Sequence, residues 1–258
     1  MEESTAPVIL VTAGSAGLGA AAVRLFAKHG YRVVVNYSSN AERATKLLNE
    51  LLTLSGITPN DEDEDLALSR RFVAIRADLG SRDEIARLVR ETVKRFGRLD
   101  IVFSNGGWTR ARGMVSIDDN CFEDEWDRAF NMNVKAHLWL MQAARAHLDE
   151  TEGAFVTTAS LAGVNHSGSS LVRDSERALE IWSNTMAAPK IRVNSVSPGL
   201  LLTEWAEKFT DEQKEAHLQK TKLKRIVTVE DVAEQVLTFA KSRSMTGVNV
   251  LMDAGFVL

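Results

Sequence analysis

A glycine-rich turn between two apolar runs is the stretch whose residue types point most directly to chemistry. Gly14, Gly17 and Gly19 follow the apolar run 8–11 and precede apolar residues at helical spacing. Glycines let a backbone turn sharply and approach a ligand, and the N-terminus of a following helix offers unpaired N–H groups to phosphate. The pattern predicts a strand, a turn that binds the pyrophosphate of a dinucleotide, and a helix. A tight turn that binds nothing would use the same residue types, so later residues must decide.

The turn resembles the motif Thr-Gly-x-x-x-Gly-x-Gly of the short-chain dehydrogenases/reductases. Thr12, Gly17 and Gly19 match this motif, whereas Ala13 stands in place of its first glycine. We expect the neighbouring Gly14 to supply the backbone freedom that Ala13 lacks. The resemblance covers nearly the whole chain. It implies an α/β fold with a Rossmann-type doubly wound parallel sheet in three layers, α/β/α, and ligands at the carboxyl ends of the strands.

The resemblance also implies where a nicotinamide cofactor binds. Asn36, Tyr37 and Ser38 end the second apolar run, where NAD-preferring relatives carry an acid. These neutral residues would not repel a 2′-phosphate, so we expect NADP(H) as the cofactor and expect Asn36→Asp to reverse or erase that preference. The cofactor-binding residues implied in this way are Gly14, Ser15, Gly17, Leu18, Gly19, Asn36, Tyr37, Ser38, Asp78, Leu79, Asn105, Gly106, Gly107, Pro198, Gly199, Leu201 and Thr203.

The catalytic residues of the family are only partly present. In the family a hydride passes between the nicotinamide and a substrate carbon, while a tyrosine whose pKa is lowered by a lysine exchanges the proton. Asn133 and Ser160 match the family's catalytic Asn and Ser, but the positions of its Tyr-x-x-x-Lys pair carry Arg173 and Arg177. An arginine stays charged near neutral pH and cannot exchange that proton. Ordinary carbonyl reduction therefore loses its acid.

An iminium substrate would need no acid, because its C=N⁺ group already carries the charge that a carbonyl acquires by protonation. Asp174 and, as a second candidate, Glu176 flank the replaced tyrosine position, and either carboxylate could stabilise such a cation. The expected catalytic residues are Asn133, Ser160, Arg173, Asp174 and Arg177.

Tryptophans occur where the family builds its substrate pocket. Tryptophan faces attract cations and stack on flat rings, so we expect an aromatic or cationic small molecule as the substrate. The expected pocket residues are Trp108, Arg112, Trp182 and Trp205.

The missing pair and the tryptophan-rich loops are similar to a fungal indole-alkaloid branch of the family. Members of that branch reduce an iminium with NADPH and can then guide a cyclisation. Two other interpretations remain open: a nucleotide-binding pseudoenzyme, and a slow carbonyl reductase in which Ser160 and water replace the tyrosine.

Apolar runs alternate with helical patterns along the chain, as a doubly wound parallel sheet requires. An acidic run, 61–65, indicates a surface insertion at about residues 56–70 in a single domain of residues 1–258. We expect strands at 8–11, 32–36, 72–77, 99–103, 154–158, 191–196 and 248–252, and helices at 20–29, 41–54, 81–96, 124–147, 178–187 and 232–242.

Composition restricts the class of partner. The 31 basic and 35 acidic residues give a net charge of −4, which offers no attraction to nucleic acid or to an anionic membrane. A single cysteine, Cys121, excludes an internal disulfide and a cysteine-cluster metal site. We find no signal-peptide pattern and no apolar run of membrane-spanning length. We therefore expect a cytoplasmic protein that binds no metal and, as in the family, forms a homo-oligomer.

Overall fold

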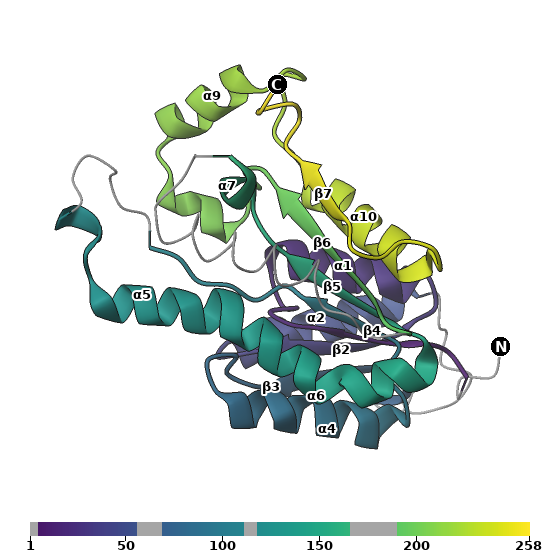
Figure 1. Ribbon diagram of the computed structural model, residues 1–258. Coiled ribbons are helices and arrows are strands. Elements are labelled where there is room, and N and C mark those ends of the chain that lie inside the picture. The colour runs from purple at the N-terminus through teal and green to yellow at the C-terminus, as the bar shows by residue number, and fades with distance from the viewer. Residues whose placement is uncertain (1–4, 56–68, 111–117, 166–189) are drawn as a thin grey trace.

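The computed structural model describes residues 5–55, 69–110, 118–165 and 190–258. These residues form a seven-stranded parallel sheet in the order β3-β2-β1-β4-β5-β6-β7, with helices on both faces (Figure 1). The expected α/β class with a doubly wound sheet and three layers is confirmed. The strands are β1 (Val8–Val11), β2 (Arg32–Tyr37), β3 (Phe72–Arg76), β4 (Ile101–Ser104), β5 (Ala154–Thr158), β6 (Arg192–Pro198) and β7 (Asn249–Met252).

The α-helices follow the expected order with three differences. A π-helical turn, η2, lies between α5 and α6 within the expected helix 124–147, and α7 and α9 are not among the expected helices. The helices are α1 (Gly17–Lys28), α2 (Ala41–Leu54), α4 (Arg82–Phe96), α5 (Glu123–Phe130), η2 (Asn131–Lys135), α6 (Ala136–Thr151), α7 (Leu161–Val164), α9 (Asp211–Lys220) and α10 (Val229–Lys241), with 3-10 turns η1 (Asp118–Asn120) and η3 (Glu204–Lys208).

The core consists of two layers, one on each face of the sheet. Side chains alternate between the faces of a strand, so Ile9 and Val11 pack toward α1 and α10, whereas Val8 and Leu10 pack toward α4 and α6. Both faces are covered, which explains why β1 is apolar throughout rather than alternating. Because all seven strands are parallel, their carboxyl ends lie along the same edge of the sheet.

Two expected segments fall largely or wholly outside the described residues. These are the helix 178–187 and most of the insertion at about 56–70. Within the parts of the chain that the structure describes, the helices are too short or too polar to cross a membrane.

Candidate functional site

The turn after β1 is tied to the loop after β4 through one buried threonine. The Thr12 hydroxyl accepts hydrogen bonds from the backbone N–H of Asn105 at 2.8 Å and of Gly106 at 3.2 Å. The Asn105 side chain in turn accepts a hydrogen bond from the hydroxyl of Thr158, at the end of β5. Three strand ends that are far apart in the sequence thus form one polar edge, where the family resemblance placed the cofactor.

Ala13 bears the backbone strain of the glycine turn. Its φ is 48°, in the left-handed region, whereas Gly14 is not among the residues with positive φ. This corrects the expectation that Gly14 supplies the necessary freedom. Gly14 is needed for another reason, since a Cβ there would lie 2.9 Å from the carbonyl oxygen of Val11.

We expect Ala13→Gly to raise the free energy of unfolding by about 0.5–1 kcal/mol. Left-handed backbone costs an L-residue about 1–2 kcal/mol, and the greater freedom of glycine in the unfolded chain offsets part of the gain. Urea denaturation measures the difference. The control Ala86→Gly, inside α4, should lower stability by about 1 kcal/mol. A loss of stability in Ala13→Gly would contradict the assigned strain.

The start of α1 is suited to a pyrophosphate. Its N-cap residue is Ala16, which provides no side-chain hydrogen bond, whereas α2, α4, α9 and α10 each begin with a side-chain cap. The first N–H groups of α1 therefore remain available to an anion. Gly17 lies at this start with a φ of 49°. A Cβ there would come within 3.2 Å of the Thr203 methyl group, so the loop after β6 packs against the turn.

The Asn36 side chain is buried and hydrogen-bonds to the glycine turn, so it does not face a ribose. Its side chain is 1% exposed, and its Oδ1 accepts a hydrogen bond from the Ala13 N–H at 3.1 Å. Its Nδ2 donates to the carbonyl oxygens of Tyr37, Ile75 and Ala77. The amide is fully used inside the protein. This corrects the expectation that an acid at Asn36 would act directly on the cofactor preference.

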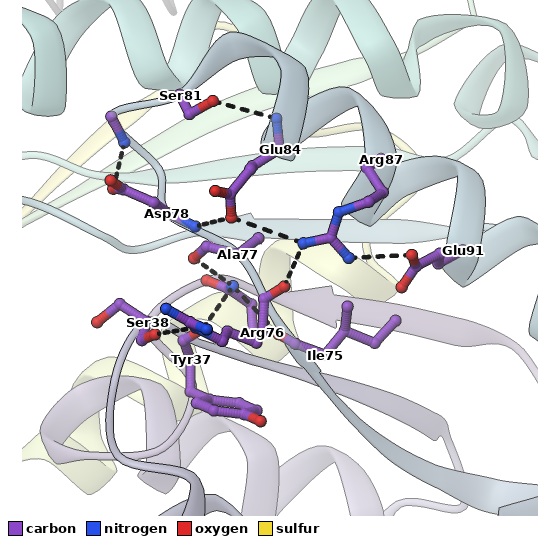
Figure 2. Close-up of polar contacts among 12 residues, drawn as sticks. Tyr37, Ser38, Ile75, Arg76, Ala77, Asp78, Ser81, Glu84, Arg87 and Glu91 are labelled. Atoms are coloured by element: carbon purple, nitrogen blue, oxygen red, sulfur yellow. Dashed lines mark hydrogen bonds and ion pairs between the residues drawn. The ribbon is translucent and has the colours of Figure 1, made fainter.

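The end of β3 is organised by side-chain contacts to the backbone, which Figure 2 shows. The Asp78 carboxylate accepts the N–H of Gly80 at 2.8 Å, and Glu84 accepts the N–H of Asp78 at 2.8 Å. Nearby, the Nε of Arg76 donates to the carbonyl oxygen of Ser38 at 3.0 Å. Asp78 and Ser38 are exposed, so both can be reached by a ligand at this edge.

The loop after β4 is fixed by two residues of the interrupted helix. Asn133, 2% exposed, accepts the N–H of Trp108 at 2.7 Å and donates to its carbonyl oxygen at 2.9 Å. One turn further, His137 Nδ1 lies 2.6 Å from the hydroxyl of Ser104, and its ring also hydrogen-bonds to the backbone of Gly106. Burial lowers the pKa of His137 to about 4, so the ring is neutral at physiological pH.

His137 was not found from the sequence. The available signal was its spacing of four from Asn133, which places both side chains on one helix face.

Three further expected site residues, Ser160, Trp108 and Trp205, lie within the described part of the chain. Ser160, at the end of β5, accepts the N–H of Ala162 at 3.1 Å. The Trp108 ring has the guanidinium of Arg128 at 4.7 Å from its centroid, so one cation already lies over it. Trp205 is 46% exposed, in η3.

The other expected residues lie outside the described part of the chain. They are Arg112, Arg173, Asp174, Glu176, Arg177 and Trp182. Their roles stay predictions.

The loop after β6 lies at the same carboxyl edge of the sheet as the loops after β1, β4 and β5. Gly199 donates its N–H to the carbonyl oxygen of Met252 at 2.8 Å, and Leu201 forms a parallel bridge with Val227. Pro198 is the last residue of β6. The Thr203 hydroxyl accepts the N–H of Trp205 at 3.3 Å and thereby caps η3.

Comparison with protein-family models gives a match over residues 12–257 to the model described as Enoyl-(Acyl carrier protein) reductase. The chain is 32% identical over 258 residues to granaticin polyketide synthase putative ketoacyl reductase 2 of Streptomyces violaceoruber, covering 97% of this chain and 96% of that protein. It is 31% identical over 224 residues to versicolorin reductase 1 of Dothistroma septosporum, and this match covers 80% of this chain and 78% of that protein.

Solved structures agree with these matches. A short-chain dehydrogenase from Burkholderia cenocepacia in complex with NADP has a TM-score of 0.83 and 31% identity, with 98% of each chain covered. A short-chain dehydrogenase/reductase from Serratia marcescens has a TM-score of 0.84 and 26% identity, again with 98% of each chain covered.

Proposed function

The chain belongs to the short-chain dehydrogenase/reductase family of oxidoreductases, and on that premise we propose that it uses NADP(H) to reduce a substrate that needs no tyrosine as proton donor. Three features support NADP(H): the uncapped start of α1, the neutral end of β2 and the NADP in the related Burkholderia structure. The bound nicotinamide would supply hydride at its C4 carbon.

The absence of a suitable tyrosine carries this proposal. The whole chain has two tyrosines. Tyr31 lies just before β2, at the amino end of the sheet, where it is 8% exposed and packs edge-on against Phe26 at 4.9 Å. Burial raises its pKa further. Tyr37 ends β2. Neither follows β4 or β5, after which lie Trp108, the hydrogen-bond partner of Asn133, and Ser160, so neither tyrosine is in sequence position to replace the missing acid.

An iminium fits a site without that acid. Its reduction takes up hydride alone and gives a neutral amine, so no proton has to be supplied. In this proposal Asp174 stabilises the cation, Arg173 binds a carbonyl or carboxylate of the substrate, and Trp205 contacts an aromatic ring. Asn133 orients the loop that carries Trp108. The coupling to a cyclisation stays a prediction.

Slow carbonyl reduction is the second candidate, and the Streptomyces relative named as a putative ketoacyl reductase favours it. The Ser160 hydroxyl would then bind the carbonyl oxygen, and water would supply the proton. Without a lysine-activated tyrosine we expect this turnover to be slow.

The experiment that tests the proposal supplies NADPH carrying deuterium at C4 to a panel of cyclic aromatic iminium ions and ketones. We expect deuterium on the carbon adjoining nitrogen. A carboxylate about 4 Å from a cationic nitrogen contributes roughly 4 kcal/mol at an effective dielectric near 20, before desolvation. Asp174→Asn should therefore slow iminium reduction about ten- to a hundredfold, while NADPH affinity stays the same.

Glu176→Gln tests the second candidate carboxylate, and a larger slowing in this variant than in Asp174→Asn would assign the cation to Glu176. Deuterium transferred to ketones at a higher rate than to any iminium would favour the carbonyl reductase. Absence of transfer to every substrate would leave the nucleotide-binding pseudoenzyme.

A further inference from the structure

A groove runs along the outermost strand of the sheet. Among the described residues, β3 is paired with β2 on one side and with no strand on the other (Figure 1). The groove has a volume of about 650 Å³ and lies between this free side of β3 and the helix α4. Residues 73–76 of β3 form one wall, and Arg87, Glu91, Lys94 and Arg95 of α4 form the other.

Part of the β3 backbone is directed toward this groove. The Ala77 N–H donates to the carbonyl oxygen of Tyr37, so Ala77 faces β2. Backbone groups alternate between the two sides of a strand, so Ile75 also faces β2 and Ala74 directs its N–H and carbonyl oxygen away from it. No described residue is hydrogen-bonded to these two groups of Ala74. A free strand edge of this kind can pair with another extended chain.

Arg87 closes the carboxyl end of this edge. Its Nη2 donates to the carbonyl oxygen of Arg76 at 2.7 Å, and its Nη1 is 2.9 Å from Oε1 of Glu91 (Figure 2). Its charge is further balanced by Glu84, at 3.6 Å. The part of the edge that is open to a partner therefore ends before the Arg76 carbonyl group.

The helix wall beyond Arg87 is basic. Lys94 and Arg95 are exposed and form no ion pair with a described residue, and Arg95 donates to the neutral carbonyl oxygen of Ser69. Among the described residues that line the groove, Glu91 is the one carboxylate against four basic residues, whereas the whole chain has a net charge of −4. The groove is thus a positive surface on an acidic protein. It attracts an acidic partner and repels a second copy of the same edge.

The size of the groove suits a short extended segment. The helix wall spans Arg87 to Arg95, which corresponds to about 12 Å at a rise of about 1.5 Å per residue. An extended chain advances about 3.3 Å per residue, so about four residues fit along this wall. Side chains alternate along a strand, so every second side chain of such a segment faces α4. Carboxylates at these alternate positions would meet Lys94 and Arg95.

We infer that this groove binds an extended acidic segment of a partner protein, which pairs with the β3 edge at Ala74 and directs alternate carboxylates toward Lys94 and Arg95. Backbone hydrogen bonds supply affinity in this mode of binding, and the charged wall supplies selectivity. The inference goes beyond the proposed reduction and does not rest on it.

Fluorescence anisotropy with labelled ten-residue peptides tests the inference in the full-length protein. The first peptide alternates glutamate with valine, and the second alternates lysine with valine. The third replaces two central valines of the first with proline, which keeps the charge and removes two backbone N–H groups. We expect the first peptide to bind at least about tenfold more tightly than either of the others, and its affinity to fall as the salt concentration rises.

Variants of the two walls locate the peptide. Lys94→Gln/Arg95→Gln should weaken binding of the glutamate peptide about ten- to thirtyfold, because two ion pairs are lost together. Lys46→Gln/Arg90→Gln is the matched control, since it removes one lysine and one arginine from exposed helix positions outside the groove and should leave the affinity unchanged. Ala74→Pro removes the outward N–H and keeps the bonds of β3 to β2, so it should weaken the peptide at least about tenfold with an unchanged circular dichroism spectrum.

Four results would overturn the inference. Equal affinity for the proline peptide would mean charge attraction without strand pairing, and an unchanged affinity in Lys94→Gln/Arg95→Gln would place the peptide elsewhere. Binding that appears only after the acidic run 61–65 is replaced by amides would assign the groove to that run. A dimer in sedimentation that Ala74→Pro dissociates would assign it to a second copy of the chain. Deuterium transfer from NADPH is measured without peptide and should be the same in the parent and in Lys94→Gln/Arg95→Gln, so the two proposals are tested separately.

Discussion

Asn36→Asp should lower the free energy of unfolding by about 3–5 kcal/mol, and not simply change cofactor preference. The side chain is 1% exposed and donates through Nδ2 to the carbonyl oxygens of Tyr37, Ile75 and Ala77. An aspartate would place a second acceptor against these oxygens and a negative charge in the same buried position. Removing one partner from a buried polar network, or leaving a charge unpaired there, has an effect of this size.

The loss should spread to the glycine turn, where we propose that the cofactor binds, because Asn36 also accepts the N–H of Ala13. Losing the contacts to β3 frees the β2 end and the glycine turn together. NADPH and NADH should therefore weaken in parallel.

Urea denaturation followed by circular dichroism gives the free energy, and cofactor titration of the folded fraction gives the affinities. Asn40→Asp is the matched control. Asn40 is exposed and caps α2, and aspartate caps a helix as well as asparagine, so this variant should keep parental stability. If Asn36→Asp is as stable as the parent and prefers NADH, the side chain acts on the cofactor directly and the structural assignment of Asn36 is wrong.

The sheet could be predicted because its strands obey a simple rule. Strands that are covered on both faces are apolar throughout, and each such run in β1 and β2 is followed by a turn and an amphipathic helix. The division of the long helix could not be predicted. The sequence of η2 has Met132 and Val134 among polar residues, so the alternation of apolar and polar residues expected of a helix continues through it. It contains no proline or glycine that would indicate a change from α- to π-helix.

The strand-end loops could be found from motifs, but the contacts that hold them could not. The position of Asn36 at the end of an apolar run predicts a cofactor contact, but sequence position does not show that the side chain is buried. Arg43 and Glu204 form an ion pair only because the chain folds, and no spacing rule pairs residues so far apart. The sequence suggests that Gly14 adopts the left-handed conformation in place of Ala13. The structure shows instead that Ala13 itself, at the position of the motif's first glycine, has the positive φ.

His137 should make the protein less stable in acid by an amount that a single substitution can isolate. The ring is 2% exposed and lies between the Ser104 hydroxyl and the Gly106 backbone. In the neutral ring one nitrogen donates and the other accepts, which suits a hydroxyl and a backbone group. Protonation would bury a charge, and the described residues show no carboxylate bonded to the ring.

The sign of the effect follows from the two pKa values. Burial lowers the pKa of His137 in the folded protein from 6.5 to about 4. Between these values the unfolded chain binds the proton and the folded chain does not, so stability rises with pH. The contribution is complete above pH 6.5 and is lost as the pH falls toward 4. This group alone should reduce the free energy of unfolding by about 3 kcal/mol between pH 7 and pH 4.

Urea titrations at half-unit steps from pH 7.5 to 4.5 measure this slope for the parent protein, His137→Asn and the control His29→Asn. Carboxylates also titrate near the lower limit, so the difference between proteins is the relevant quantity. Asparagine can bond to Ser104 but takes up no proton. His137→Asn should thus be less stable than the parent at pH 7.5 because of lost packing, and its disadvantage should shrink as the pH falls. His29 is exposed, so its variant should keep the parental slope. Parallel curves for the parent and His137→Asn would mean that the ring is charged, or solvated, in the folded protein, contrary to its burial against Ser104 and Gly106.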